Sequence, residues 1–231
     1  MKPTLIIATG NTHKADEIRA ILGTQFEYRT LQDFPGAPKV IEDASTFAGN
    51  ATKKAVELAK WIVTQERTRV SIRPLTQTYV LADDSGLEVD ALGGAPGVLS
   101  ARFAALDKNI GGNAPDAANR EKLLLVLREV PLEKRTARFR CVIALTPLLL
   151  PQPEDASPVC YADEHELQTR LFEGTCQGRI GFEERGSGGF GYDSLFLPTG
   201  YDQTFAQLGE VVKNGMSHRG RALAALKKFL I

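Results

Sequence analysis

The stretch LIIATGNTHKADEIRAIL, residues 5–22, joins an apolar run to a segment with helical spacing through a short polar turn. Leu5 to Ala8 is typical of a buried strand, and the apolar residues from Ala15 onward recur at helical intervals until Gly23. A strand followed directly by a helix is the building unit of α/β folds. The sequence therefore predicts an α/β protein.

The polar turn between strand and helix has the composition of an anion site. The N-terminus of a helix exposes backbone N–H groups at the positive end of the helix dipole, which suits a phosphate. Thr9, Asn11 and Thr12 add neutral donors and Lys14 adds a positive charge. The second glycine and the Lys-Ser/Thr pair of a Walker loop are missing. Asn11 or Thr12 could instead simply cap the helix, and the stretch alone leaves both interpretations open.

Composition indicates an ordinary globular chain. The 231 residues are 43% hydrophobic and 24% charged, with 28 lysines plus arginines against 28 aspartates plus glutamates. The balanced charge gives no argument for a nucleic-acid or membrane partner, and we expect neither. We also expect no signal peptide and no membrane span. Cys141, Cys160 and Cys176 share no metal-ligand spacing with the three histidines, so we expect reduced thiols and a cytoplasmic protein. One domain spanning residues 1–231 is expected.

Further elements follow from periodicity. We predict helices over residues 46–65, after Pro115 and after Ser217, and strands over residues 79–82, 139–145 and 167–180. The segments 66–78 and 147–158 are predicted to be surface connections.

Two adjacent carboxylates, Asp83 and Asp84, follow the apolar run Tyr79–Ala82. We expect them at the end of a strand, where Ser85-Gly86 allows the chain to turn so that both reach one site. Such a pair could hold Mg²⁺ and supply a base for water, or it could be a helix cap or a solvated turn. Glu42-Asp43 would join this site only if the fold brings it close.

Two glycine-containing segments near the C-terminus complete the candidates. Residues 186–193, GSGGFGYD, suit close approach of backbone to a ligand, with Phe190 or Tyr192 presenting a ring, or else form a flexible hairpin around a buried Phe. Residues 213–220, KNGMSHRG, place His218 and Arg219 after the N-cap candidate Ser217. Cations at a helix start are tolerated best when they share an anion with it.

Five stretches in order along the chain resemble the inosine/xanthosine triphosphate pyrophosphatase family (dITP/XTP pyrophosphatases). They are ATGNTHK, EDASTFAGNATKKA, LADDSGLEVDALGGAPGVLSARF, GSGGFGYDSLF and SHRGRAL. The resemblance implies an elongated mixed sheet flanked by helices in two lobes, a nucleotide cleft between the lobes, and a homodimer. It also implies Mg²⁺-dependent hydrolysis of ITP, dITP and XTP to the monophosphate and pyrophosphate.

The resemblance also assigns roles to residues. Asp84 is the expected catalytic base, and Glu42, Asp83 and Asp84 are the expected metal ligands. The expected substrate contacts are Thr9, Gly10, Asn11, Thr12, His13, Lys14, Lys54, Ser85, Phe190, Gly191, Tyr192, Asp193, Lys213, His218 and Arg219.

The chain departs from the family pattern at Gly49, where a Glu is usual, so any role of that carboxylate must be missing or supplied elsewhere. The segments 66–78 and 147–165 also look longer than typical. Two rival functions remain: a nucleotide-binding regulatory module without turnover, and a pyrophosphatase for modified pyrimidine nucleotides, which GGFGYD and SHRG disfavour.

Overall fold

The computed structural model describes residues 2–68, 77–106, 112–149 and 163–231. Most of the predicted connection 66–78 and of the long segment 147–165, including Cys160, therefore lies outside the described residues. Cys141 and Cys176 are free and buried, as expected of reduced thiols.

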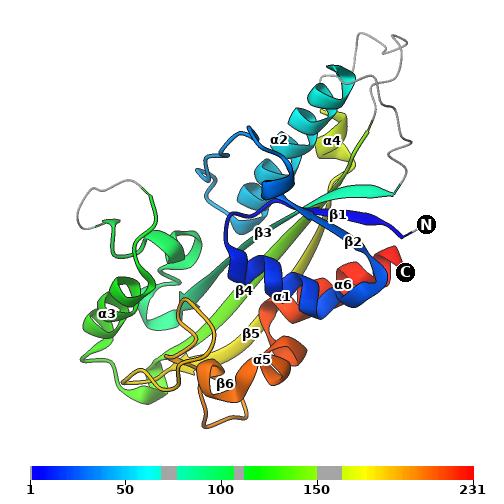
Figure 1. The fold of residues 1–231 in the computed structure, drawn as a ribbon. Helices are drawn as coiled ribbons and strands as arrows, with labels where there is room; N and C mark the ends of the chain where they lie inside the picture. The colour runs from blue at the N-terminus through cyan, green and yellow to red at the C-terminus, as the bar shows by residue number, and fades with distance from the viewer. Residues whose placement is uncertain (1, 69–76, 107–111, 150–162) are drawn as a thin grey trace. The chain divides into compact units, whose positions relative to one another are not determined.

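Within these described ranges, six strands form one mixed sheet in the order β2-β1-β3-β4-β5-β6 (Figure 1). β1 runs parallel to both β2 and β3, whereas β5 and β6 are antiparallel. The strands are β1 Thr4–Ile7, β2 Glu27–Thr30, β3 Thr78–Val89, β4 Thr136–Pro147, β5 Arg170–Ile180 and β6 Phe196–Pro198. A mixed sheet with flanking helices confirms the predicted α/β class.

The chain divides into two compact units. Unit 1 contains Met1–Asp84 and Val142–Phe172, and unit 2 contains Ser85–Cys141 and Glu173–Ile231. β3, β4 and β5 each contribute residues to both units. Each unit is described by itself below.

Unit 1 carries the predicted strand-loop-helix start. Its helices are α1 Thr12–Leu22, α2 Phe47–Thr68 and α4 Glu164–Leu167, with 3₁₀ turns at Gly23–Gln25 and Leu31–Asp33. α2 packs beside the short α4 (Figure 1). Leu5 and Ile7 of β1 are buried together with Ile18 of α1 and Leu58 of α2, so the apolar periodicity in the sequence marks the core of this unit.

Unit 2 is built around a cluster of aromatic side chains. The ring of Phe139 on β4 lies 4.7 Å from that of Phe196 and 6.1 Å from that of Phe205. The helices around this cluster are α3 Asp116–Leu127, α5 Phe205–Met216 and α6 His218–Leu230, and 3₁₀ segments lie at Asp90–Leu92, Gly97–Arg102 and Leu132–Lys134. None of the helices in the described ranges of either unit has the length and apolar character needed to cross a bilayer.

Several boundaries differ from the prediction. The strand expected over residues 79–82 extends through Asp83 and Asp84 to Val89, so the prediction that both carboxylates follow a strand end is wrong. Burial overrides the low strand propensity of Asp and Gly here, because side chains from unit 1 compensate both charges. Residues 167–169 belong to the end of α4 and a turn, not to a strand. β2, β6 and α5 were not predicted at all.

Candidate functional site

The loop after β1 caps helix α1 with its own polar side chains. The backbone N–H of Lys14 donates to Asn11 Oδ1 at 3.1 Å, and the N–H of Asn11 donates to Thr9 Oγ1 at 3.1 Å. Gly10, Asn11, Thr12 and His13 are exposed, and the first turn of α1 contains no acidic residue. The capping interpretation is therefore correct, and the capped helix start also remains open toward an anion.

Asp83 on β3 is paired with the lysine of that same helix start. Lys14 Nζ lies 2.5 Å from Asp83 Oδ1, and the Asp83 carboxylate is buried. Parallel pairing of β1 with β3, with Ile7 opposite Leu81, aligns the loop after β1 with this part of β3. A bond between residues 69 positions apart in the sequence thus joins the first two candidate motifs.

Asp84 lies next to Asp83 but contacts residues of helix α2. Asn50 Nδ2 donates to Asp84 Oδ2 at 3.0 Å, and Lys54 Nζ lies 3.8 Å from Asp84 Oδ1. Desolvation by burial raises the pKa of Asp84 from 3.8 to about 6, against the lowering effects of Lys54 and Lys14. A carboxylate with a pKa near neutrality is suited to general base catalysis.

Lys54 links the two acidic candidates of unit 1. Its Nζ donates to the backbone oxygen of Asp83 at 2.8 Å and lies 3.2 Å from Glu42 Oε2. Glu42 is thereby brought to the group that contains Asp84, which the sequence could not show. Its neighbour Asp43 instead pairs with the surface residue Lys53.

Asn50 was not singled out in the sequence, yet it connects Asp84 to the loop that follows Glu42. Its side chain is fully buried, and its Oδ1 accepts from the backbone N–H of Ala44 at 2.9 Å. A signal was present, because an asparagine three residues after Phe47 falls on the apolar face of α2.

Gly49 packs closely against this same loop. A Cβ at position 49 would lie 2.8 Å from the Cβ of Ala44 and 3.1 Å from Thr46 Oγ1. The N–H of Gly49 also donates to Thr46 Oγ1 at 3.0 Å. The departure from the family pattern at this position is therefore matched by a loop that closes the space a larger residue would need.

The carboxylates of unit 1 provide oxygen ligands of the kind that Mg²⁺ prefers. Among the side chains that the structure describes, no group of three or more His, Cys, Asp or Glu residues could hold a metal ion. Mg²⁺, however, is usually bound by one or two protein carboxylates together with water and substrate phosphates. Carboxylates of Glu42 and Asp84 both lie within 4 Å of Lys54 Nζ. This oxygen-donor set fits a magnesium ion that a phosphate helps to bind.

In unit 2, a buried ion pair organises the glycine-rich segment. Lys213 Nζ of α5 lies 2.7 Å from Asp193 Oδ2, and the two side chains are only 3% and 4% exposed. The same carboxylate oxygen accepts from the backbone N–H of Phe190 at 3.0 Å. At Gly189, with φ +74°, a Cβ would lie 2.2 Å from that oxygen, so the turn requires glycine.

The start of α6 brings His218 and Arg219 into this group. Ser217 caps the helix as predicted, its side chain accepting from the N–H of Gly220. Arg219 Nη2 lies 3.3 Å from Ser85 Oγ on β3, and the His218 ring stacks on Phe139 at 4.8 Å. Both residues of the pair are buried, so they do not form a solvated basic surface.

Of the two aromatic rings in the glycine-rich segment, Phe190 is the one near the cations. Lys213 Nζ lies 4.8 Å from the centre of its ring and the Arg219 guanidinium lies 5.7 Å from it. Tyr192 lies in the core of unit 2, and its hydroxyl donates to the backbone oxygen of Ser100 at 2.8 Å. Burial raises the pKa of Tyr192 well above its usual value. Tyr192 thus anchors the segment.

Comparison with known proteins gives consistent matches over nearly the whole chain. Residues 5–229 match the model of the Ham1 family. The dITP/XTP pyrophosphatase of Shouchella clausii (strain KSM-K16) is 42% identical over 97% of this chain and 94% of its own length. The dITP/XTP pyrophosphatase of Geobacter sulfurreducens (strain ATCC 51573) is 44% identical over 98% of this chain and 96% of its own length.

Solved structures agree with the sequence matches. A HAM1 protein from Coxiella burnetii superposes with a TM-score of 0.75 at 33% identity, covering 100% of this chain and 98% of that chain. The Ham1 protein of Staphylococcus aureus gives a TM-score of 0.72 at 33% identity, covering 98% and 97%.

Proposed function

This chain belongs to the Ham1 family, and we propose that it hydrolyses the non-standard purine triphosphates ITP, dITP and XTP to the nucleoside monophosphate and pyrophosphate. Such an enzyme removes these nucleotides from the precursor pool. The observation that carries the proposal is Asp84, a buried carboxylate with a pKa of about 6 beside Lys54 and near Lys14.

Unit 1 is proposed to bind the phosphates. The N–H groups at the start of α1 and the side chains of Thr9, Asn11 and Thr12 offer neutral donors, and Gly10 and His13 lie in the same exposed turn. Lys14 and Lys54 supply the positive charge that offsets charge developing on phosphate oxygens. Both lysines are held against carboxylates in the free protein, so a triphosphate would take over partners that are already positioned.

Asp84 is proposed as the base. Its carboxylate is oriented by Asn50 and would accept the proton of the attacking water. A pKa near 6 leaves it mostly ionised at pH 7 and basic enough to take a proton. The carboxylates of Glu42 and Asp84, with Asp83 next to them, would supply one or two ligands to Mg²⁺ alongside water and substrate phosphates. When bound, the ion polarises phosphate oxygens and lowers the pKa of water.

Unit 2 is proposed to bind the base. Phe190 offers a ring, the turn from Gly191 to Asp193 fixes the backbone beside it, and Ser85, Lys213, His218 and Arg219 supply polar contacts. A 6-oxo purine presents an acceptor to donors such as Arg219, whereas ATP presents an amino group at the same position. Buried mispairing of this kind can give discrimination of about 10⁴–10⁵.

A nucleotide panel tests the proposal. We expect pyrophosphate release from ITP, dITP and XTP with Mg²⁺, and kcat/KM values for ATP and GTP that are far lower. Rejection of GTP needs a wall or an opposed donor at the 2-amino group, which we assign to the segment from Phe190 to Asp193. Nucleotide binding without release of pyrophosphate would indicate a regulatory module instead. Preferred cleavage of modified pyrimidine triphosphates would indicate the other rival function.

Three further properties belong to the same proposal. We infer that the protein acts in the cytoplasm, that it forms a homodimer, and that its small-molecule substrate is its ligand rather than a nucleic acid or a membrane. Light scattering coupled to gel filtration measures the oligomeric state directly.

A further inference from the structure

We propose that Asp116 and Arg120 of helix α3 are positioning residues that hold the peptide groups of Gly191, and thereby set how selectively the protein binds the purine base. The inference rests on the proposed function for its consequence, and on the geometry of unit 2 for its cause. Neither residue belongs to the predicted site.

Gly191 is held from both sides by one helix. Its backbone N–H donates to Asp116 Oδ2 at 2.7 Å, and its backbone oxygen accepts from Arg120 Nη1 at 3.0 Å. Asp116 and Arg120 are four residues apart, so their side chains project from the same face of α3. We call these two contacts the Gly191 clamp.

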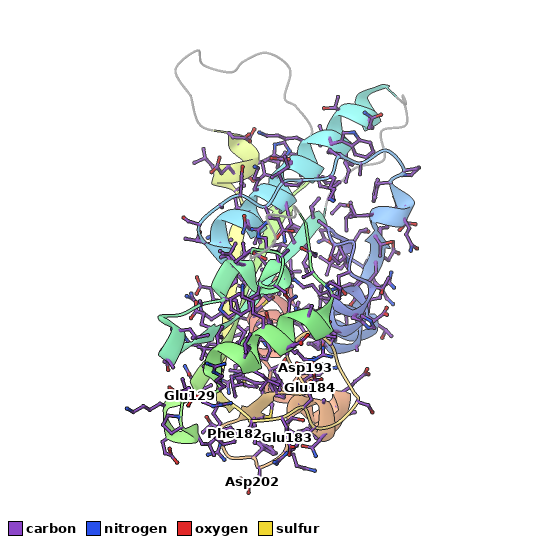
Figure 2. The ribbon with its side chains drawn as sticks, turned by 90° about the vertical axis from the view of Figure 1, so that its left-hand side faces the viewer. Glu129, Phe182, Glu183, Glu184, Asp193 and Asp202 are labelled. Atoms are coloured by element: carbon purple, nitrogen blue, oxygen red, sulfur yellow. The ribbon has the colours of Figure 1, made fainter. Side chains whose placement is uncertain are left out.

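The clamp reaches a second point of the same segment. Arg120 Nε donates to Glu184 Oε2 at 2.8 Å, and this oxygen also accepts from Ser194 Oγ at 3.0 Å. Arg120 therefore contacts the chain at Gly191 and again at Glu184, seven residues earlier; Glu184 and Asp193 are both labelled in Figure 2. The guanidinium of Arg120 thus holds both Gly191 and Glu184.

The hydrogen bond between Gly191 and Asp116 is not an ordinary helix cap. An acidic residue in the first turn of a helix usually interacts with the N–H groups of its own helix. Asp116 instead accepts from a residue 75 positions away, and Pro115 at the N-cap makes no side-chain cap bond. Gly191 has φ +61°, a left-handed conformation that an unrestrained segment need not keep.

The residue before Gly191 is Phe190, whose ring lies near Lys213 and Arg219. The backbone N–H of Phe190 donates to Asp193, and the backbone oxygen of Gly191 accepts from Arg120. The peptide group before Phe190 and the one after Gly191 are therefore both fixed. A shift at Gly191 would therefore move the ring that we assign to the base. Asp116 and Arg120 act through this displacement and need no contact with the nucleotide.

Four variants test the clamp. Asp116→Ala and Arg120→Ala remove one contact each, Asp116→Asn keeps an oxygen acceptor, and Glu121→Ala is the matched control because Glu121 is an exposed residue on the same helix. Hydrogen–deuterium exchange of the nucleotide-free protein reports on the Gly191 N–H without any activity. We expect exchange about tenfold faster in Asp116→Ala, partial protection in Asp116→Asn and wild-type exchange in Glu121→Ala.

Steady-state kinetics test whether the Gly191 clamp affects recognition of the base. In Asp116→Ala and Arg120→Ala we expect KM for ITP to rise about tenfold, kcat to change little, and the preference for ITP over GTP to fall. Inhibition by pyrophosphate, which has no base, should be unchanged. Asp116→Asn should recover part of the preference.

Two results would overturn the clamp: unchanged Gly191 exchange in Asp116→Ala, or faster exchange with unchanged KM and unchanged preference. A wild-type protein that releases no pyrophosphate from any triphosphate would instead overturn the proposed function, and with it the selectivity consequence. The exchange experiment separates these cases because it does not depend on turnover.

Discussion

The charged groups of the two units are held in different ways. In unit 1, Lys54 has three oxygen partners between 2.8 and 3.8 Å, from Glu42, Asp83 and Asp84. In unit 2, Lys213 Nζ lies 2.7 Å from Asp193 Oδ2, and both side chains have almost no exposure to solvent. A charged side chain with several oxygen partners can exchange some of them for phosphate oxygens or a metal ion. A buried ion pair instead fixes the positions of both of its side chains. This difference fits the roles proposed for the units, with phosphate chemistry in unit 1 and recognition of the base in unit 2.

The largest expected effect is on the reacting side. Asp84→Asn should lower kcat by roughly 10²–10⁴-fold, because the amide keeps the shape but cannot accept a proton from water. Nucleotide binding, measured by calorimetry, should survive. Asp83→Asn is the companion variant, and it should raise the Mg²⁺ concentration needed for half-maximal turnover. Near-normal turnover in Asp84→Asn would remove Asp84 from the role of base.

Breaking the buried Lys213–Asp193 pair should lower the free energy of unfolding more than the other substitutions do. Lys213→Met leaves Asp193 buried without this partner, and loss of one member of a buried pair costs about 3–5 kcal/mol. Urea unfolding measures the difference in the free energy of unfolding. Lys53→Met is the control, because the exposed Lys53–Asp43 pair has a similar distance of 2.8 Å and should leave the urea midpoint unchanged. Equal destabilisation by both variants would contradict the contrast between the units.

The pKa of Asp84 predicts a pH dependence of stability. Because the pKa in the folded protein is raised from 3.8 to about 6, folding favours the protonated form, and stability falls as pH rises through this window. Two pKa units correspond to up to about 3 kcal/mol, present as a penalty above pH 6 and absent below pH 4. Asp84→Asn removes the penalty, so in EDTA it should raise Tm at pH 8 and change it little at pH 4. A stabilisation that is equal at both pH values would argue against the raised pKa.

The substitution of Lys14 is expected to have the smallest of these effects, on the affinity for triphosphates. Lys14→Ala should weaken triphosphate binding about 10–100-fold while leaving the corresponding nucleosides unaffected, because it removes one charge-assisted contact to phosphate. Arg19→Ala on the same helix is the matched control, since Arg19 pairs with Asp16 at the surface. Equal losses for triphosphate and nucleoside would exclude Lys14 from the phosphate site.

Local chemistry made part of the site predictable. Asn11, one of two cap candidates for the first helix, caps α1, and the candidate Ser217 caps α6, because capping depends on a few adjacent residues. The partners of the carboxylates could not be predicted, since Asp83 meets Lys14 across 69 residues and Asp84 meets Asn50 across 34. Such contacts are decided by the pairing of β1 with β3 and by the packing of α2, which no short stretch encodes.

The close approach of Gly49 to Ala44 has an evolutionary consequence. Since a Cβ at position 49 would meet the Cβ of Ala44 at 2.8 Å, a glutamate cannot enter this position in one mutational step without displacing the loop that follows Glu42. Ala44→Gly would remove the closer of the two contacts, and the 3.1 Å contact with Thr46 Oγ1 would remain. We therefore expect the cost of a substitution at position 49 to depend on which residue occupies position 44, five residues earlier.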